Sequence, residues 1–220
     1  MIKAIIPIRE SASRNIELED FFKEAGVEIL YSKNKQSIWE AFSAGYKYIG
    51  KTDIVILCHD DIYFYTSPKK VIKIIKRELS DLKTGFIGVA GAKKLRKSGV
   101  WWDGIREPVE KRGLSGQVFH APEEKYNLSY YGPYGQVQVL DGVFIACRAS
   151  LLQEIGLNKP SWMPEESNWD FYDVFMTFKA DQKGYVNKTV PIQITHDSKG
   201  IPRDSWDKAR EAFITRFMLG

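Results

Sequence analysis

Two neighbouring carboxylates follow the clearest strand pattern in the chain. The segment Cys58-His59-Asp60-Asp61-Ile62 comes directly after Asp53–Cys58, a mostly β-branched apolar run that is typical of a buried parallel strand. In open α/β sheets, ligands gather beyond the carboxyl ends of the strands. Two carboxylates there suit a hard divalent cation, Mg²⁺ or Mn²⁺, that also binds phosphate oxygens. The alternative is a solvated Asp pair that caps a turn.

A second acidic cluster lies in the segment Trp169-Asp170-Phe171-Tyr172-Asp173. Asp170 and Asp173 are three residues apart, so at the start of a helix they would share one face. The alternative is that both carboxylates complement the positive end of the helix dipole.

A third polar cluster, Thr195-His196-Asp197-Ser198-Lys199-Gly200, ends a strand-like run. His196 is either a metal ligand or a core residue that makes a hydrogen bond. Other chemistry lacks its usual signature, because the chain has no Walker A sequence, no Gly-x-Gly-x-x-Gly after a strand, no zinc-like Cys/His spacing and no Gly-x-Ser-x-Gly elbow.

The elements that must position these clusters alternate through the first half of the chain. Apolar runs predict strands, and apolar residues at helical spacing predict helices between them. We expect a single α/β domain over residues 1–220, with a mostly parallel central sheet flanked by helices. The expected strands cover residues 3–8, 27–31, 53–58 and 86–90, and the expected helices begin near residues 16, 38 and 68.

Residues 92–135 break this alternation. They are rich in Gly, Pro, Lys, Trp and Tyr and show little periodicity, so we expect an irregular loop or lid. After this stretch, the pattern predicts strands over residues 137–147 and 185–195 and helices over residues 148–155, 170–184 and 204–219.

The net charge of +4 in 220 residues is unevenly distributed. Residues 69–97 hold ten basic and two acidic residues, which leaves −4 on the rest of the chain. The basic residues are interleaved with apolar and acidic ones and no recognition motif is present, so we do not expect a nucleic-acid partner. We expect the cluster Lys93, Lys94, Arg96 and Lys97 to meet phosphates, and the preceding helix lysines to face solvent or an anionic surface.

Two cysteines, Cys58 and Cys147, cannot form a disulfide framework, so we expect buried thiols in a cytoplasmic protein. No apolar run is long enough to span a membrane, and the first residues lack the layout of a signal peptide. The terminal helix leaves a peripheral membrane contact open, although core packing is the simpler interpretation. Oligomeric state has no signal in the sequence.

Taken in order, six segments resemble the family-2-like glycosyltransferases with the GT-A fold, and most closely the small branch grouped with the streptomycin-biosynthesis StrF domain. His59 stands where the strict Asp-x-Asp motif has its first Asp, and Tyr172 replaces the Glu of the family's Glu-Asp pair. The segments that carry the resemblance are Ala4–Arg9, Asn34–Ala41, Val55–Ile62, Leu140–Arg148, Trp169–Asp173 and Ile194–Gly200.

The resemblance implies a metal-dependent, inverting transfer of a sugar from a nucleotide diphosphate donor, such as a UDP-sugar, to a hydroxyl of a glycan or other acceptor. Residues 1–91 would form the nucleotide-binding half, residues 92–135 the lid, and residues 136–220 the acceptor-side half. Mn²⁺ or Mg²⁺ would be held by Asp61, Asp60 and His196, and Asp173 or Asp170 would be the base. The donor nucleotide would meet Pro7, Arg9, Asn34, Ser37, His59 and Asp60, and the acceptor would meet Asp141, Gly142 and Trp169.

Two alternatives remain. The opening Ile6–Arg14 has some likeness to the cytidylyltransferases for acidic sugars, although Asn15 and Ile16 follow where a lysine is expected. This alternative is a sugar nucleotidyltransferase. The other is a non-catalytic module that binds a nucleotide or a carbohydrate.

Overall fold

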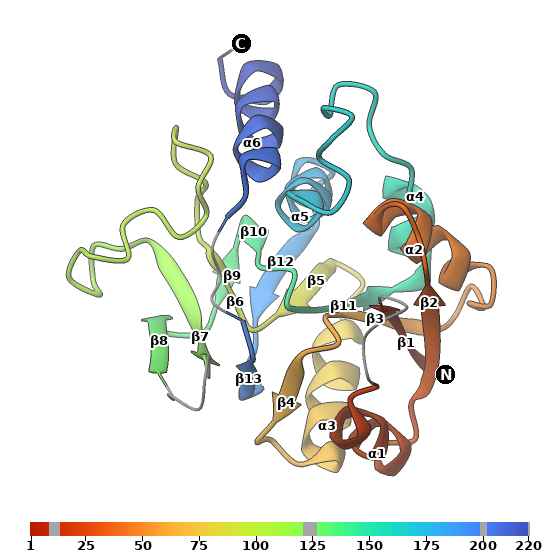
Figure 1. The fold of residues 1–220 in the computed structure, drawn as a ribbon. Helices are drawn as coiled ribbons and strands as arrows, with labels where there is room; N and C mark the ends of the chain where they lie inside the picture. The colour runs from red at the N-terminus through yellow and green to blue at the C-terminus, as the bar shows by residue number, and fades with distance from the viewer. Residues whose placement is uncertain (9–13, 121–126, 199–201, 220) are drawn as a thin grey trace.

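A computed structural model describes residues 1–8, 14–120, 127–198 and 202–219 (Figure 1). A seven-stranded sheet forms its centre. Three strands at one side run parallel, β11 runs antiparallel between β3 and β5, and β12 is again parallel to β5. In spatial order, the strands are β2 (Glu28–Lys33), β1 (Ile2–Ile8), β3 (Ile54–Cys58), β11 (Phe144–Arg148), β5 (Thr84–Gly88), β12 (Val186–Thr189) and β9 (Gln136–Val137). The expected mostly parallel α/β sheet is therefore confirmed.

The central strands are apolar because both of their faces are covered. Ile5, Ile56, Leu57 and Ile145 have no exposed surface, as expected for strands buried between two helical layers. In Figure 1, α2, α4 and α5 lie on one face of this sheet, and α1 and α3 lie on the other. The helices are α1 (Ile16–Glu24), α2 (Ile38–Tyr46), α3 (Pro68–Leu79), α4 (Ala149–Ile155), α5 (Tyr172–Gln182) and α6 (Asp204–Phe217).

Helix starts follow the capping residues in the sequence. The side chain of Asn15 accepts a hydrogen bond from the backbone N–H of Leu18, and Ser37 does the same for Glu40. Pro68 opens α3, where its missing N–H costs no hydrogen bond. Among the described residues, no helix is long and apolar enough to cross a membrane.

A second sheet stands beside the first and supports the site. Its order is β10 (Val139–Leu140), β6 (Ala90–Ala92), β7 (Leu114–His120), β13 (Ile194–His196) and β4 (Ile62–Phe64), and β8 (Asn127–Gly132) pairs with β7. Strand β13 pairs with β4 so that His196 lies opposite Ile62. This pairing joins a segment from the first third of the chain to one from its last third.

Three expectations about local structure are corrected. Residues 92–135 are not irregular throughout, because β7 and β8 pair there. The sequence shows no clear alternation in β7, because consecutive residues at its start are buried. The run 137–147 is divided among β9, β10 and β11, and the run 185–195 is divided between β12 and β13, which lie in different sheets.

Candidate active site

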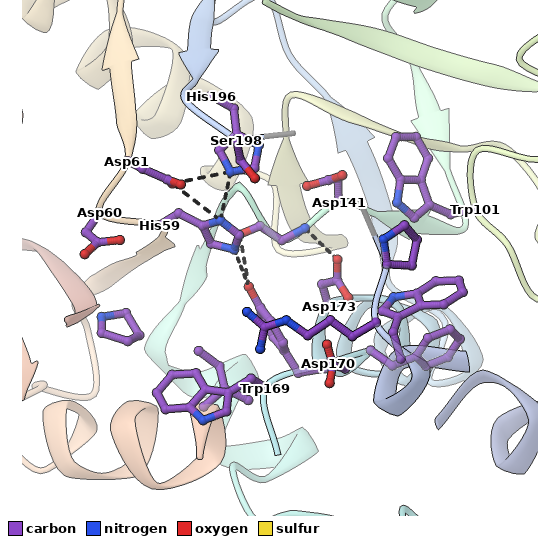
Figure 2. Close-up of a pocket in the computed structure, with 18 of the residues that line it drawn as sticks. His59, Asp60, Asp61, Trp101, Asp141, Trp169, Asp170, Asp173, His196 and Ser198 are labelled. Atoms are coloured by element: carbon purple, nitrogen blue, oxygen red, sulfur yellow. Dashed lines mark hydrogen bonds and ion pairs between the residues drawn. The ribbon is translucent and has the colours of Figure 1, made fainter. Parts of the chain in front are cut away.

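A pocket of about 600 Å³ opens beyond the ends of β1 and β3. Its lining includes His59, Pro7 and eight other described residues that were predicted to belong to the site (Figure 2). They are Asp60, Asp61, Asp141, Gly142, Trp169, Asp170, Asp173 and His196. Tertiary structure thus gathers segments from five regions of the chain into one cavity.

Three ligand-type atoms converge on one point of this pocket. Nδ1 of His59 lies 3.2 Å from Nε2 of His196, and Oδ1 of Asp61 lies 3.3 Å from the same Nε2 atom. Oδ1 of Asp61 is 3.8 Å from Nδ1 of His59, and all three atoms lie within 4.8 Å of one another. Figure 2 shows the three side chains pointing toward one another from the β3–β4 loop and the end of β13.

The arrangement fits a divalent cation. Oδ1 of Asp61 is shielded from solvent and has no hydrogen-bond donor among the described residues, which is costly for a carboxylate oxygen unless another positive partner binds it. Burial acts to raise the pKa of Asp61, but His196 and His59 outweigh it, so the pKa lies below its ordinary value and the carboxylate stays charged. Two imidazoles and one carboxylate form a donor set that suits Mn²⁺ better than Mg²⁺.

The surroundings shift the pKa values of the two histidines in opposite directions. Burial and the neighbouring His196 lower the pKa of His59. Burial also acts to lower the pKa of His196, but Asp61 raises it above its ordinary value. A neutral His59 leaves a lone pair available for a cation, since only unprotonated imidazole nitrogens bind metals.

Asp60 does not belong to this three-residue group, although it lines the pocket. Its backbone carbonyl and that of Ile62 each accept a 3.1 Å hydrogen bond from the Asn15 side-chain amide, which holds the loop after β3. Figure 2 shows its carboxylate apart from the convergent atoms. His59, expected as a nucleotide contact, takes the place in the group that the sequence assigned to Asp60.

Asp173 is held at the opposite side of the pocket. Its Oδ2 accepts a 2.7 Å hydrogen bond from the backbone N–H of Gly142. Burial and the negative charge of Asp141 raise the pKa of Asp173 from 3.8 to about 7. A carboxyl group with this pKa can take up and release a proton near neutral pH, as a general base must.

A family model described as a glycosyltransferase-like family matches residues 10–217 of the chain. The chain belongs to this family. The match covers both acidic clusters and His196. It confirms the resemblance to family-2-like glycosyltransferases, whereas the finer placement in the StrF-like branch stays a prediction.

Solved structures support the GT-A fold. A crystal structure of GalNAc-T7 with UDP, GalNAc and Mn²⁺ is similar over 90% of this chain, at 10% identity and a TM-score of 0.53. This glycosyltransferase-like chain spans less than half of that protein, because the match covers 44% of the GalNAc-T7 chain.

Two further likenesses are weaker. A197 from STIV is 12% identical over 90% of this chain and 87% of its own, with a TM-score of 0.49. A CMP:2-keto-3-deoxy-manno-octonic acid synthetase complexed with CTP is 12% identical over 98% of this chain and 99% of its own, with a TM-score of 0.43. TM-scores below 0.5 support no inference about activity. No curated protein matches the chain.

In this glycosyltransferase-like chain, Asp170 and Asp173 do not share a helix face, contrary to the sequence prediction. Helix α5 begins at Tyr172, after Phe171, whose φ of 60° is left-handed. Phe171 is buried and packs on Trp206, which fixes this turn. Asp170 therefore points elsewhere in the pocket and accepts a 2.6 Å hydrogen bond from Ser205 of α6.

Gly142 is required by its neighbours. A Cβ at this position would overlap Oη of Tyr172 and lie 2.8 Å from Cβ of Asp173. Asp141 beside it accepts a 2.8 Å hydrogen bond from the backbone N–H of Val143. The glycine lets the β10–β11 turn approach the start of α5 closely enough to bind Asp173.

The other expected nucleotide contacts are placed differently. Arg9 lies outside the described residues. Asn34 and Ser37 do not line the pocket; Asn34 adopts a φ of 55°, and Ser37 caps α2, whose first residue, Ile38, does line the pocket. No local pattern indicates how far these side chains lie from the cavity.

The basic cluster at residues 93–97 does not face the pocket. Arg96 instead binds Glu107 through hydrogen bonds of 2.7 and 3.0 Å, within the loop that follows β6. Among the described lining residues, the one lysine or arginine is Arg203, next to the start of α6. Arg203 is not predictable from the sequence, because a single Arg near a helix start forms no recognisable pattern.

Aromatic side chains form part of the pocket wall. Trp101, Trp102 and Trp206 line it, and their rings are in contact with one another at centroid distances of 5.6 and 5.0 Å. Trp169 is 38% exposed at the same pocket. The Trp101–Trp102 pair was visible in the sequence, but its place beside α6 depends on the packing of the whole domain.

Proposed function

We propose that the chain is a metal-dependent, inverting glycosyltransferase that moves a sugar from a nucleotide diphosphate donor to an acceptor hydroxyl. The observation that carries this proposal is the convergence of His59, Asp61 and His196 in the same pocket as Asp173, whose pKa is raised to about 7. Membership of a glycosyltransferase-like family supports the same reaction class.

His59, Asp61 and His196 would hold Mn²⁺ or Mg²⁺, and Asp60 would lie beside them. A divalent cation bound there supplies positive charge for the diphosphate leaving group. The chain's own cation at the pocket, Arg203, would contact the same phosphates. Pro7, which lines the pocket, would contact the nucleoside, and Arg9, Asn34 and Ser37 stay nucleoside contacts that the family resemblance predicts.

Asp173 would act as the base. The acceptor oxygen attacks the anomeric carbon, the bond from that carbon to the diphosphate breaks, and the acceptor proton passes to the Asp173 carboxylate. One displacement of this kind inverts the anomeric centre. Asp170 remains the second candidate base, although the Ser205 hydroxyl already donates to it.

On the acceptor side, Gly142 positions Asp173, the charge of Asp141 raises its pKa, and Trp169 offers an exposed ring in the same pocket. A ring of this kind can stack on a sugar face. Residues 92–135 contribute Trp101 and Trp102 to the wall, in keeping with the proposed lid that excludes water from the donor. Both cysteines are buried free thiols, which is consistent with the proposed cytoplasmic location.

Thermal denaturation with a panel of nucleoside diphosphates tests the donor and metal sites together. UDP and Mn²⁺ are the first probes, because the GalNAc-T7 structure holds both. A ligand that binds only the folded chain raises its melting temperature. At a concentration of 100 times its Kd, it adds ~2.7 kcal/mol to the free energy of unfolding. We expect nucleotide and Mn²⁺ together to give a larger shift in the native chain than either gives alone, and no Mn²⁺-dependent shift in Asp61→Asn.

The exposed carboxylate variant Asp20→Asn is the matched control and should keep the full shift. Absence of any metal-dependent shift with every nucleotide would refute the proposal. A sugar nucleotidyltransferase would instead release pyrophosphate from a nucleoside triphosphate and a free sugar. A non-catalytic module would bind nucleotide and metal but release no nucleoside diphosphate from any nucleotide-sugar.

A further inference from the structure

Tyr172 connects the two halves of the candidate active site. It is 5% exposed, and its hydroxyl lies 3.2 Å from Nε2 of His59 and 3.3 Å from the carbonyl oxygen of Gly142. The backbone N–H of Gly142 in turn binds Asp173. A continuous hydrogen-bonded path therefore runs from the cation site to the proposed base, as the dashed lines from His59 and Asp173 in Figure 2 partly trace.

The direction of each bond in this path follows from counting hydrogens. A tyrosine hydroxyl has one hydrogen, and a carbonyl oxygen can only accept. The Tyr172 hydrogen therefore goes to Gly142, and the Tyr172 oxygen must accept from Nε2 of His59. A neutral imidazole carries one ring hydrogen, so with that hydrogen on Nε2 the lone pair is on Nδ1. Nδ1 is the atom that faces Asp61 and His196.

We propose that Tyr172 is a positioning residue that sets the tautomer and orientation of His59, so that Nδ1 is presented to a divalent cation together with Asp61 and His196. Metal-binding histidines commonly donate their other ring N–H to a second group, which fixes the ring and raises its affinity. Here that group is a neutral hydroxyl, anchored in turn by a backbone carbonyl. The inference rests on the metal site of the proposed function.

The hydroxyl of Tyr172 can be separated from the packing of its ring. The ring meets Phe42 edge-on at a centroid distance of 5.5 Å, and a phenylalanine at position 172 would keep this contact. The hydroxyl is accommodated because Gly142 has no Cβ. Tyr172→Phe is therefore the variant that removes only the proposed positioning group.

The experiment measures Mn²⁺ binding to the free protein by calorimetry, without donor or acceptor. We expect Tyr172→Phe to weaken Mn²⁺ binding by about 10–100-fold. The matched control is Tyr46→Phe, which removes a hydroxyl bound at 2.9 Å to the carbonyl of Ala149, away from the pocket. Tyr46→Phe should leave Mn²⁺ affinity within about twofold of the native chain, since it changes no group near the cation site.

A second measurement needs no metal, and its decisive result comes from the native chain. Long-range ¹H–¹⁵N correlation spectra of the metal-free native chain report which nitrogen of each histidine is protonated, and the His59 signals are assigned by their loss in His59→Gln. We expect His59 as the Nε2–H tautomer, and a mixture of tautomers in Tyr172→Phe. An Nδ1–H tautomer in the native chain would overturn the proposal.

The two inferences fail in distinguishable ways. If the native chain binds Mn²⁺, Asp61→Asn does not, and Tyr172→Phe binds with unchanged affinity, the positioning role of Tyr172 is wrong and the metal site stands. If the native chain binds neither Mn²⁺ nor Mg²⁺, the metal site of the proposed function is wrong and the role of Tyr172 falls with it.

Discussion

The backbone N–H of Gly142 donates a 2.7 Å hydrogen bond to the carboxylate of Asp173. This bond joins the β10–β11 turn to the first turn of α5, 31 residues further along the chain. It fixes the orientation of a carboxylate that lines the pocket. The catalytic assignment of Asp173 depends on this bond and on the raised pKa of its carboxyl group.

Replacing the proposed base should abolish most of the turnover. Asp173→Asn keeps an oxygen that can accept from Gly142 but cannot take up the acceptor proton. We expect kcat for sugar transfer to fall by about 10²–10⁴-fold, the usual contribution of a general base. Release of nucleoside diphosphate from the donor measures this rate. Asp170→Asn should lower kcat clearly less than Asp173→Asn does. If Asp170→Asn lowers kcat more, Asp170 is the base.

The rate should rise with pH through neutrality. Asp173 must be ionised to accept a proton, and its pKa is about 7, so the active form predominates above that pH. We expect kcat/KM to increase about tenfold from pH 5 to pH 6 and to level off above pH 8, as measured by initial rates at constant ionic strength. A flat profile across this interval would contradict an ionising group at this site.

The same carboxylate should destabilise the fold at neutral pH. The folded-state pKa of Asp173 is raised above its ordinary value, so the protonated form stabilises the fold and this stability is lost as the pH rises from about 4 to about 7. Asp173→Asn removes the free-energy cost of burying a charged carboxylate. We expect its melting temperature to exceed the native value by at least ~2 °C at pH 8, roughly 1 kcal/mol, and to match it near pH 4.

Enlarging Gly142 should disturb both neighbours of the turn. Gly142→Ala would place a Cβ against Tyr172 Oη and 2.8 Å from Cβ of Asp173. We expect a loss of about 1–3 kcal/mol in the free energy of unfolding, measured by urea denaturation. Gly135→Ala is the control, because nothing lies within 4 Å of a Cβ there. Equal stability of the two variants would show that the turn adapts to the methyl group.

Removing the positive charge of Arg203 from the pocket should weaken donor binding. We expect Arg203→Ala to raise the Kd for UDP in the presence of Mn²⁺ by about 10-fold, or ~1.4 kcal/mol, the scale of one charge-assisted contact. Titration calorimetry measures the change. Arg216→Ala, an exposed arginine in the last turn of α6, is the matched control and should bind as the native chain does. Unchanged affinity in Arg203→Ala would place the phosphates elsewhere.

Local patterns determined much of the architecture. The apolar run at Asp53–Cys58 predicts β3 to within one residue, and Asn15 and Ser37 cap the helices that their positions indicate. These features depend on residues close in sequence, through burial, capping and turn geometry. Both acidic clusters were visible for the same reason, since strand ends and helix starts mark where polar side chains gather.

Pairing over long distances decided the rest. Strands β7 and β8 were missed because their residues gain stability from partners in a second sheet and not from a local period. The left-handed turn at Phe171 separates Asp170 from Asp173, and it is held by packing on α6, more than 30 residues later.

The sequence by itself determined that this chain is a single α/β domain with carboxylates at the ends of its central strands. Only the tertiary structure decided which of them work together. His59 and His196 are 137 residues apart, and they meet because β13 pairs with β4 directly after the loop that carries Asp61. Such contacts are set by the closure of the whole sheet, so no local spacing encodes them.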